Sequence, residues 1–313
     1  MKTKDAKYRI DWFFHKPVVF RRTLSMSLEE FNLLVIKLNP SWKKSEYERL
    51  QRSDRKKKVG QGRPYVLGSF RNLLFVTILY LRTSIGISLL AWLLGVDEDS
   101  VRRPVFRILP LIQDRFVPKT AITKGKKRIN DVDEFLKAFP ELEELIVDGT
   151  EFPIQRPKKR QKQAYSGKKK RHTKKTQLVM DRKTKLFLGA SPPKKGRIHD
   201  KKQLEKTRWD KKVPSEVKRY GDLGYLGMDK GSKGEWIIPH KSSKKKKLTK
   251  EQKQENKKIS RKRIVIEHGI RRIKIFRRVG EVVKERSEEL FSLSILASLN
   301  LANYKQIMRH GLG

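Results

Sequence analysis

Two carboxylates, Asp148 and Glu151, stand in the segment ELIVDGTEFPIQRP, directly after a short apolar run. Asp222 has a similar setting in RYGDLGY, where a predicted strand gives way to a turn that contains glycine. In open α/β sheets, ligands bind at the ends of strands. We therefore expect Asp148 and Asp222 at one edge of a sheet, where both can face a ligand.

A third acid, Glu267, lies in the segment SRKRIVIEHGIRRIKIF. If this segment is a helix, Glu267 shares one polar stripe with Arg263, Arg271 and Lys274, because these positions recur at helical spacing. A single acid would then project from a basic face. The alternative is a salt bridge from Glu267 to Arg263 or Arg271, which would stabilise the helix and have no catalytic role.

Separated carboxylates in a basic protein suit a divalent metal ion, since Mg²⁺ and Mn²⁺ prefer hard oxygen ligands. Two such ions can activate an attacking hydroxyl and stabilise the leaving oxygen of a phosphodiester. Asp200 is the rival to Asp222 as second acid, although an Asp at the head of IHDKKQLEKTRW is typical of a helix cap. Its neighbour His199 is a poor zinc candidate, because the chain has no cysteine and no second histidine at ligand spacing.

The composition favours a polyanionic partner. The 313 residues include 77 Lys and Arg against 34 Asp and Glu, a formal net charge of +43, and nucleic acid is the commonest partner for such a balance. A merely soluble surface seldom requires this excess. The absence of cysteine fits a reducing compartment, and no apolar run reaches the ~20 residues of a membrane span. We expect a cytoplasmic, nucleoid-associated protein with no membrane partner.

Three regions are predicted along the chain. A basic N-terminal region covers 1–62, and a helical region at 63–118 resembles a helix-turn-helix. In it, a short helix from Ile87 to Leu94 stops at Gly95, and a second helix carries Arg102, Arg103 and Arg107 for DNA contact. Plain packing of two helices is the alternative. Pro104 is compatible with that second helix only in its first turn.

The third region, 140–306, is predicted to be an α/β (α+β) domain. Strands are expected in ELIVDGTEFPIQ, in TQLVMDRKTKLFLGAS with a hairpin at DRKTK, and in EVKRYGDLGY. Helices are expected in IHDKKQLEKTRW, from about Thr249 to Phe276, and in a last helix capped by Ser287. A basic insertion at about 240–258 is interpreted as a solvated loop.

Several motifs in this order carry a family resemblance: VDGTEFPIQRP, YSGKKKRHTKKTQ, GRIHD, GDLGYLG and RIVIEHGIRRIK. Together they closely resemble the DDE transposases of bacterial insertion sequences, in the branch related to Harbinger elements, over residues 63–305. The resemblance implies a ribonuclease-H-like catalytic fold behind a helix-turn-helix domain. It also implies two Mg²⁺ ions, or Mn²⁺ in their place, and cut-and-join chemistry on double-stranded DNA by a dimer or larger assembly.

The resemblance assigns Asp148, Asp222 and Glu267 as the metal-binding catalytic acids. Related transposases place an Arg four residues before that Glu and a Lys seven after it, as Arg263 and Lys274 stand here. DNA contact is further expected from three other basic side chains: His172, Lys174 and Arg271.

Two alternatives from other classes stay open at this point. One is a repurposed, catalytically inactive DNA-binding protein of transposase origin. The other is a basic RNA-binding protein, which would need no paired acids.

Overall fold

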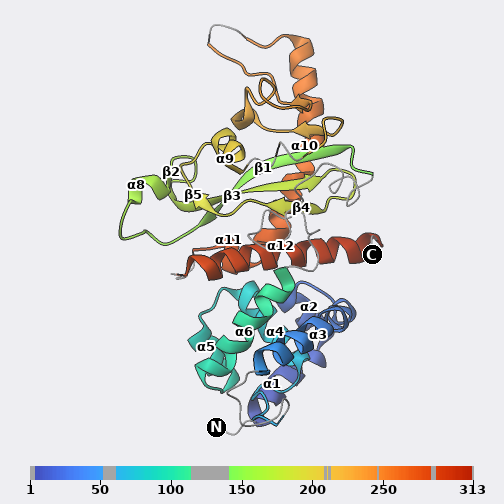
Figure 1. The fold of residues 1–313 in the computed structure, drawn as a ribbon, viewed down its shortest axis with the longest axis vertical. Coiled ribbons are helices and arrows are strands. Elements are labelled where there is room, and N and C mark those ends of the chain that lie inside the picture. Colours follow the sequence, from blue (N-terminus) through green and yellow to red (C-terminus); the bar gives the residue numbers. More distant parts are fainter. Residues whose placement is uncertain are drawn as a thin grey trace. The chain divides into compact units, whose positions relative to one another are not determined.

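The computed structural model describes residues 4–51, 61–113, 141–207, 210, 213–244, 247–282 and 287–311. The chain divides into two compact units (Figure 1). The helical unit comprises Met1–Arg115, Ile275–Val279 and Arg286–Leu301, and the sheet unit comprises Phe116–Lys274, Gly280–Glu285 and Ala302–Gly313. Residues 114–140, which include the predicted region boundaries at 118 and 140, lie outside the described residues.

The helical unit begins with three helices that the sequence interpretation missed: α1 (Lys4–Phe14), α2 (Pro17–Leu24) and α3 (Leu28–Leu50). A capping box starts α3, because the Ser27 hydroxyl accepts from the Glu30 amide and the Glu30 carboxylate accepts from the Ser27 amide. The Ser-x-x-Glu spacing was therefore a readable signal for this helix. Aromatic residues of α1, α2, α3 and the following helix pack together as the core: Phe14, Phe20, Phe31 and Phe75.

The predicted helices of the 63–118 region are present as α4 (Phe70–Thr83), α5 (Ile87–Leu94) and α6 (Glu98–Gln113). Every residue of α4 from Asn72 to Leu81 is buried, so this helix is enclosed on all sides rather than on one face. Gly95 ends α5 with φ of 69°, as predicted. The prediction for Pro104 was wrong: α6 begins at Glu98, so Pro104 stands beyond the first turn and the helix continues through it.

The sheet unit contains a seven-stranded mixed sheet, with the main order β2-β3-β1-β6-β7. The long strands β1 (Glu144–Pro153) and β3 (Arg171–Asp181) pair antiparallel, whereas β6 (Lys218–Tyr220) pairs parallel to β1 and β7 (Trp236–Ile237) parallel to β6. Three short strands pair with β3: β2 (Tyr165–Ser166), β4 (Phe187–Ala190) and β5 (Lys194–Lys195). The predicted strands and the hairpin at DRKTK are confirmed, and the α+β class with them.

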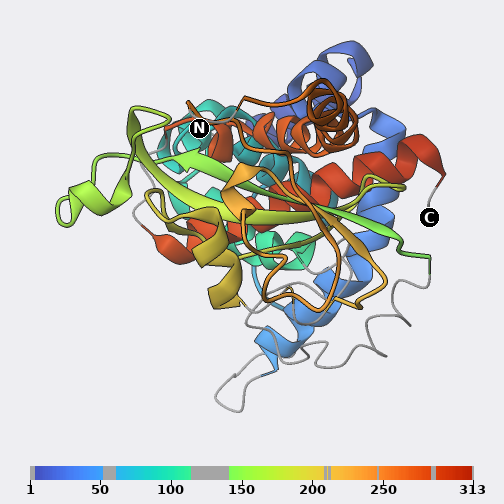
Figure 2. The same cartoon turned by 90° about the horizontal axis from the view of Figure 1, so that it is seen from above.

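The helices of the sheet unit are α8 (Gln161–Ala164), α9 (Asp200–Thr207), the 3₁₀ helix η2 (Leu223–Tyr225) and α10 (Lys250–Lys274). Figure 2 shows α8 projecting from the edge of the sheet. A reciprocal pair of hydrogen bonds between Thr249 and Gln252 starts α10. The helix predicted from about Thr249 is therefore confirmed, and the solvated-loop interpretation was wrong for 250–258, which belong to that helix.

Opposite faces of β1 pack against different partners. One face packs in a core cluster with α9, η2 and β7 that includes Leu145, Val147, Leu204, Tyr225 and Trp236. The other face meets α10, whose buried Gly269 leaves space for the side chains of Met180 and Phe187. Side chains of α9 and η2 can therefore approach β1 from one face of the sheet, and side chains of α10 can approach it from the other.

The remaining helices are α11 (Arg277–Gly280) and α12 (Glu288–His310), and α12 contributes residues to both units. The predicted cap is confirmed, because the Ser287 hydroxyl accepts from the Leu290 amide at 3.1 Å. Among the described helices, none is long and apolar enough to cross a membrane.

Candidate active site

Asp148 and Asp222 lie level with each other on neighbouring parallel strands. The register pairs Glu144 with Lys218 and Ile146 with Tyr220, and the same offset places Asp148 opposite Asp222, just beyond the end of β6. Residues at equal positions on adjacent parallel strands point to the same side of a sheet. The strand-end position expected from the sequence for Asp222 is therefore present, and Asp148 lies inside β1 at the same level.

The Asp148 carboxylate is largely buried, with 18% of its side chain exposed. Burial raises the pKa of Asp148 to about 6, and the neighbouring Asp222 and Asp200 carboxylates act in the same direction, while the Arg263 guanidinium opposes them. The Arg263 guanidinium lies 3.9 Å from the Asp148 carboxylate. A buried acid surrounded by other acids is a position at which a bound cation would relieve repulsion.

Asp222 is held by the turn that follows it. Its carboxylate accepts a hydrogen bond from the Gly224 amide at 2.8 Å and so caps η2. Tyr225 at the end of this turn is buried and stacks on Trp236 with 5.6 Å between ring centroids. This stacking fixes the turn on the core, so the Asp222 backbone is tied to a rigid part of the sheet.

Asp200 also reaches the site, although the sequence favoured a capping role. A Cβ atom built on Gly149 would lie 2.1 Å from the Asp200 carboxylate, and one built on Gly224 would lie 3.0 Å from it. The Asp200 side chain thus fits between the backbones that follow Asp148 and Asp222. Its partner is the Lys175 ammonium at 3.4 Å rather than an amide of α9. Burial raises the pKa of Asp200, with the Lys175 ammonium opposing and the Asp222 carboxylate reinforcing the shift.

Lys175 is a largely buried residue beside the candidate acids that sequence reasoning missed. Only 11% of its side chain is exposed, and its ammonium lies between the carboxylates of Asp200 and Glu151, at 3.4 Å and 4.0 Å. Glu151 faces Lys175 directly in the β1–β3 register and accepts a hydrogen bond from the Thr173 hydroxyl at 2.8 Å. Lys175 stands within a long basic run, so the sequence around it gives no sign that its side chain is largely buried.

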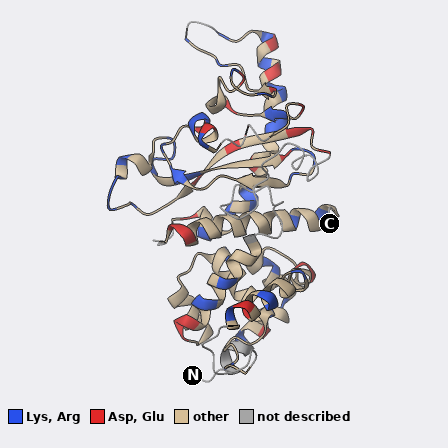
Figure 3. Ribbon diagram, viewed as in Figure 1, with Lys and Arg blue, Asp and Glu red and all other residues tan. Residues whose placement is uncertain are grey.

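Figure 3 shows the helix α10 crossing the sheet at a steep angle to its strands, and side chains of α10 contact β1. Lys262 donates to Glu144 at 2.7 Å, Arg263 pairs with Asp148, and the Lys274 ammonium lies 5.6 Å from the centre of the Phe152 ring. Burial, and to a lesser degree Lys169, lowers the pKa of Lys274, while the carboxylates of Glu151 and Asp148 oppose that shift. Side chains of α10 between Lys262 and Lys274 therefore reach β1 at Glu144, Asp148 and Phe152.

Glu267 occupies the stripe of α10 between Arg263 and Lys274, because residues three and four apart share a helix face. The side chain is exposed, and it forms no ion pair with any other described residue. The predicted alternative of a salt bridge to Arg263 is not present, since Arg263 turns to Asp148 instead. Within the described ranges, no group of three acidic or histidine side chains is arranged to enclose a metal ion.

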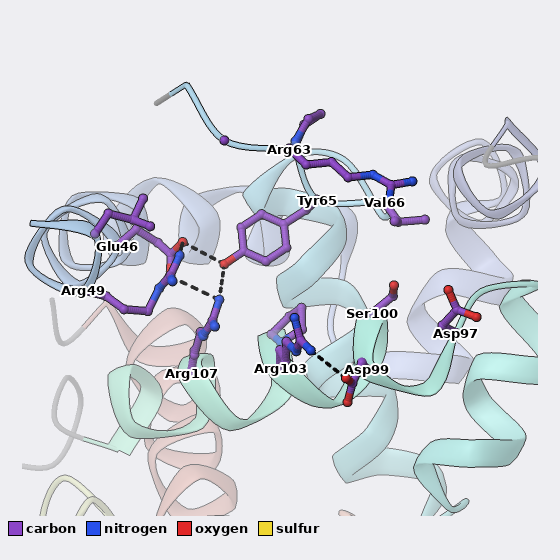
Figure 4. Close-up of a pocket in the computed structure, with 14 residues that line it drawn as sticks. Glu46, Arg49, Arg63, Tyr65, Val66, Asp97, Asp99, Ser100, Arg103 and Arg107 are labelled. Carbon is purple, nitrogen blue, oxygen red and sulfur yellow. Dashed lines mark hydrogen bonds and ion pairs between the residues drawn. The ribbon is translucent and has the colours of Figure 1, made fainter. Parts of the chain in front are cut away.

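The arginines predicted for DNA contact in α6 differ in their surroundings, and Figure 4 shows Arg103 and Arg107. Arg102 and Arg103 are exposed and pair with Glu98 and Asp99 one turn earlier. Arg107 instead donates to the Tyr65 hydroxyl at 2.6 Å, beside Glu46, in a pocket of about 700 Å³. The carboxylate partners of Arg102 and Arg103 are exposed, so a phosphate could replace them. Arg107 instead interacts with Tyr65 and Glu46 within the helical unit.

The basic residues predicted for DNA contact in the sheet unit are spread along strand β3 and helix α10. His172 and Lys174 lie on β3, where His172 contacts the Tyr165 ring and Lys174 pairs in register with Phe152 and Lys195. Arg271 is exposed on α10. The structure thus brings Asp148, Asp222, Asp200 and Arg263 together, while His172 lies further along the sheet.

Comparison with known proteins identifies the family of this chain. The family model described as "DDE superfamily endonuclease" matches residues 147–303. A curated relative, the "Probable transposase for insertion sequence element IS702" of Microchaete diplosiphon, is 38% identical over 218 residues, which cover 69% of this chain and 73% of the relative. No solved structure matches the chain. The chain therefore belongs to the DDE superfamily of endonucleases, within the transposases of insertion sequences.

Proposed function

We propose that this transposase cuts DNA at the terminal inverted repeats of an insertion sequence and joins the cut ends to target DNA. The observation that carries the proposal is the level placement of Asp148 and Asp222 on adjacent parallel strands, with the Asp222 carboxylate close enough to raise the pKa of Asp148. The long antiparallel β1–β3 pair, followed by β6 parallel to the other edge of β1, supports a ribonuclease-H-like fold for the catalytic domain at 140–306.

Asp148, Asp222 and Glu267 would hold two Mg²⁺ ions, or Mn²⁺ ions. The donor set fits, because all three groups are carboxylates, the ligands that these hard cations prefer. The bound ions would supply Lewis-acid activation of the attacking hydroxyl and charge stabilisation at the phosphodiester. Arg263 holds Asp148 in place from α10, and Lys175 neutralises Asp200 and Glu151 beside it.

The helical unit would recognise the element ends through a helix-turn-helix at 63–118 formed by α5 and α6. Arg102 and Arg103 support this role, because their ion pairs with Glu98 and Asp99 are exposed and each is worth little in water. A DNA phosphate could replace either carboxylate. Double-stranded DNA is the proposed partner, with a homodimer or larger assembly formed on it.

The proposal is tested with Glu267→Gln, which keeps the size of the side chain but removes the charge that holds a metal ion. The variant is expected to bind element-end DNA in a gel shift as wild type does and to lose Mg²⁺-dependent cleavage. Wild-type cleavage by Glu267→Gln would remove Glu267 from the metal site. If the wild-type protein binds the ends and never cuts them, the chain is a catalytically inactive DNA-binding protein of transposase origin.

A further inference from the structure

A basic pocket of about 490 Å³ lies beside the β2–β3 hairpin. Its lining includes four cationic or titratable side chains and one aromatic ring: Arg156, Lys162, His172, Arg197 and Tyr165. The chain between Glu151 and Asp181 contains no acidic residue and is rich in Lys and Arg. The pocket therefore presents an aromatic surface within strongly positive surroundings.

Tyr165 is held in this pocket with its ring accessible. Strand pairing places it opposite His172, and the two rings meet edge-on with 5.6 Å between centroids and 74° between planes. Because the planes are nearly perpendicular, the contact with His172 leaves ring surface open. Tyr165 is 41% exposed, and its hydroxyl makes no hydrogen bond to another described residue. Neither core packing nor a hydroxyl contact accounts for an aromatic side chain at this position.

The cations of the pocket are available for a ligand. Arg156 donates from Nε to the Gln161 side chain at 2.8 Å, which orients the guanidinium and leaves its two terminal nitrogens unused by that bond. None of Arg156, Lys162 and Arg197 forms an ion pair with another residue in the described ranges. The pocket thus combines an open ring face with cations that lack an anionic partner there.

We propose that this pocket binds an unpaired nucleotide of the DNA substrate, with its base stacked on Tyr165 and its flanking phosphates contacted by Arg156, Lys162 and Arg197. Stacking on an aromatic ring next to a positively charged surface is the means by which proteins bind single-stranded nucleic acid. A base inside a duplex already stacks on its neighbours, so only a base outside the duplex can offer its face to Tyr165. This inference rests on the proposed function, because it takes DNA as the substrate.

The subsite is separate from the catalytic acids. The Ile154 amide donates to the His172 carbonyl at 3.0 Å, so the pocket lies about six residues along β1 from Asp148. At ~3.3 Å per residue this is roughly 20 Å, or about six base steps of a duplex at ~3.4 Å each. The nucleotide bound here is therefore distinct from the one at the scissile bond.

The test compares two DNA ligands by fluorescence anisotropy: a duplex with a single-stranded tail and the same duplex with blunt ends. Tyr165→Ala should weaken binding of the tailed duplex about tenfold, as expected for one lost base–aromatic stack, and change blunt-duplex binding less than twofold. Tyr165→Phe, which keeps the ring, should retain wild-type affinity. Tyr47→Ala removes a tyrosine that is 53% exposed on α3 and should leave both affinities unchanged.

Two further measurements separate stacking from charge and from loss of fold. Arg156→Ala should lower the slope of log affinity against log salt by about one unit, whereas Tyr165→Ala should leave that slope at the wild-type value. Tyr165→Leu, which stays apolar but has no ring, should reproduce the loss seen with Ala. Equal losses on tailed and blunt DNA, or no loss on either, would overturn the subsite. If the wild-type protein binds neither DNA, the proposed function fails as well.

Discussion

Asp148→Asn is expected to stabilise the metal-free protein at neutral pH while it abolishes function. Asparagine keeps the size of the side chain and removes the charge that burial and two nearby carboxylates make unfavourable. The pKa of Asp148 rises from 3.8 to about 6 in the folded protein. At ~1.4 kcal/mol per pKa unit, the ionised form costs the folded state about 3 kcal/mol.

The sign of the pH dependence follows from the direction of that shift. Because the folded-state pKa is higher than the unfolded value, the stability linked to Asp148 is fully present below pH 3.8. It is lost as the pH rises through about 6. The Asn variant has no such loss. Its advantage over wild type should therefore be near zero at pH 4 and reach about 3 kcal/mol by pH 7.5.

Thermal melting in EDTA at pH 4 and pH 7.5 measures this difference. A domain of this size gains about 2–4 °C in Tm per kcal/mol, so Asp148→Asn should melt roughly 6–12 °C above wild type at pH 7.5. Asp229→Asn, which changes an exposed acid outside the site, serves as the control and should melt as wild type does. A variant that melts at or below the wild-type temperature at pH 7.5 would refute the account of the Asp148 environment. Added Mg²⁺ should narrow the gap, because it binds the wild-type site only.

Two further outcomes are expected. Asp222→Asn should abolish Mg²⁺-dependent cleavage with little change in the Tm of the metal-free protein, whereas Asp200→Asn should retain measurable cleavage. If Asp200→Asn is inactive and Asp222→Asn still cleaves DNA in a gel-based assay, Asp200 rather than Asp222 is the second metal-binding acid. Replacing Arg102 and Arg103 by Ala should weaken binding to element ends and reduce its salt slope by roughly one unit per lost phosphate contact. An unchanged slope would mean that α5 and α6 pack together without contacting DNA.

The strand end that carries Asp222 could be predicted from local sequence, because a short apolar run beside a glycine-containing turn is a local signal. The same reasoning was wrong for Asp148, because β1 continues past it to Pro153. The contact between Asp200 and Lys175 could not be predicted from local sequence. It depends on Gly149 lacking a side chain and on the pairing of β1 with β3, which joins residues far apart in the chain. The ion pair between Arg263 and Asp148 could not be predicted for the same reason, because it depends on how α10 packs against β1. The missed helices at the N-terminus are a different case, since the Ser27 capping box was local and readable.

Direct binding of Mn²⁺ to the DNA-free protein tests the central claim, that Asp148 and Asp222 form one cation site. Isothermal titration at pH 7.5 should show binding to the wild-type protein and a loss of at least about tenfold in affinity for Asp222→Asn and for Asp148→Asn. Asp229→Asn should bind as wild type does. If both site variants bind Mn²⁺ with wild-type affinity, the two aspartates do not hold the metal ion.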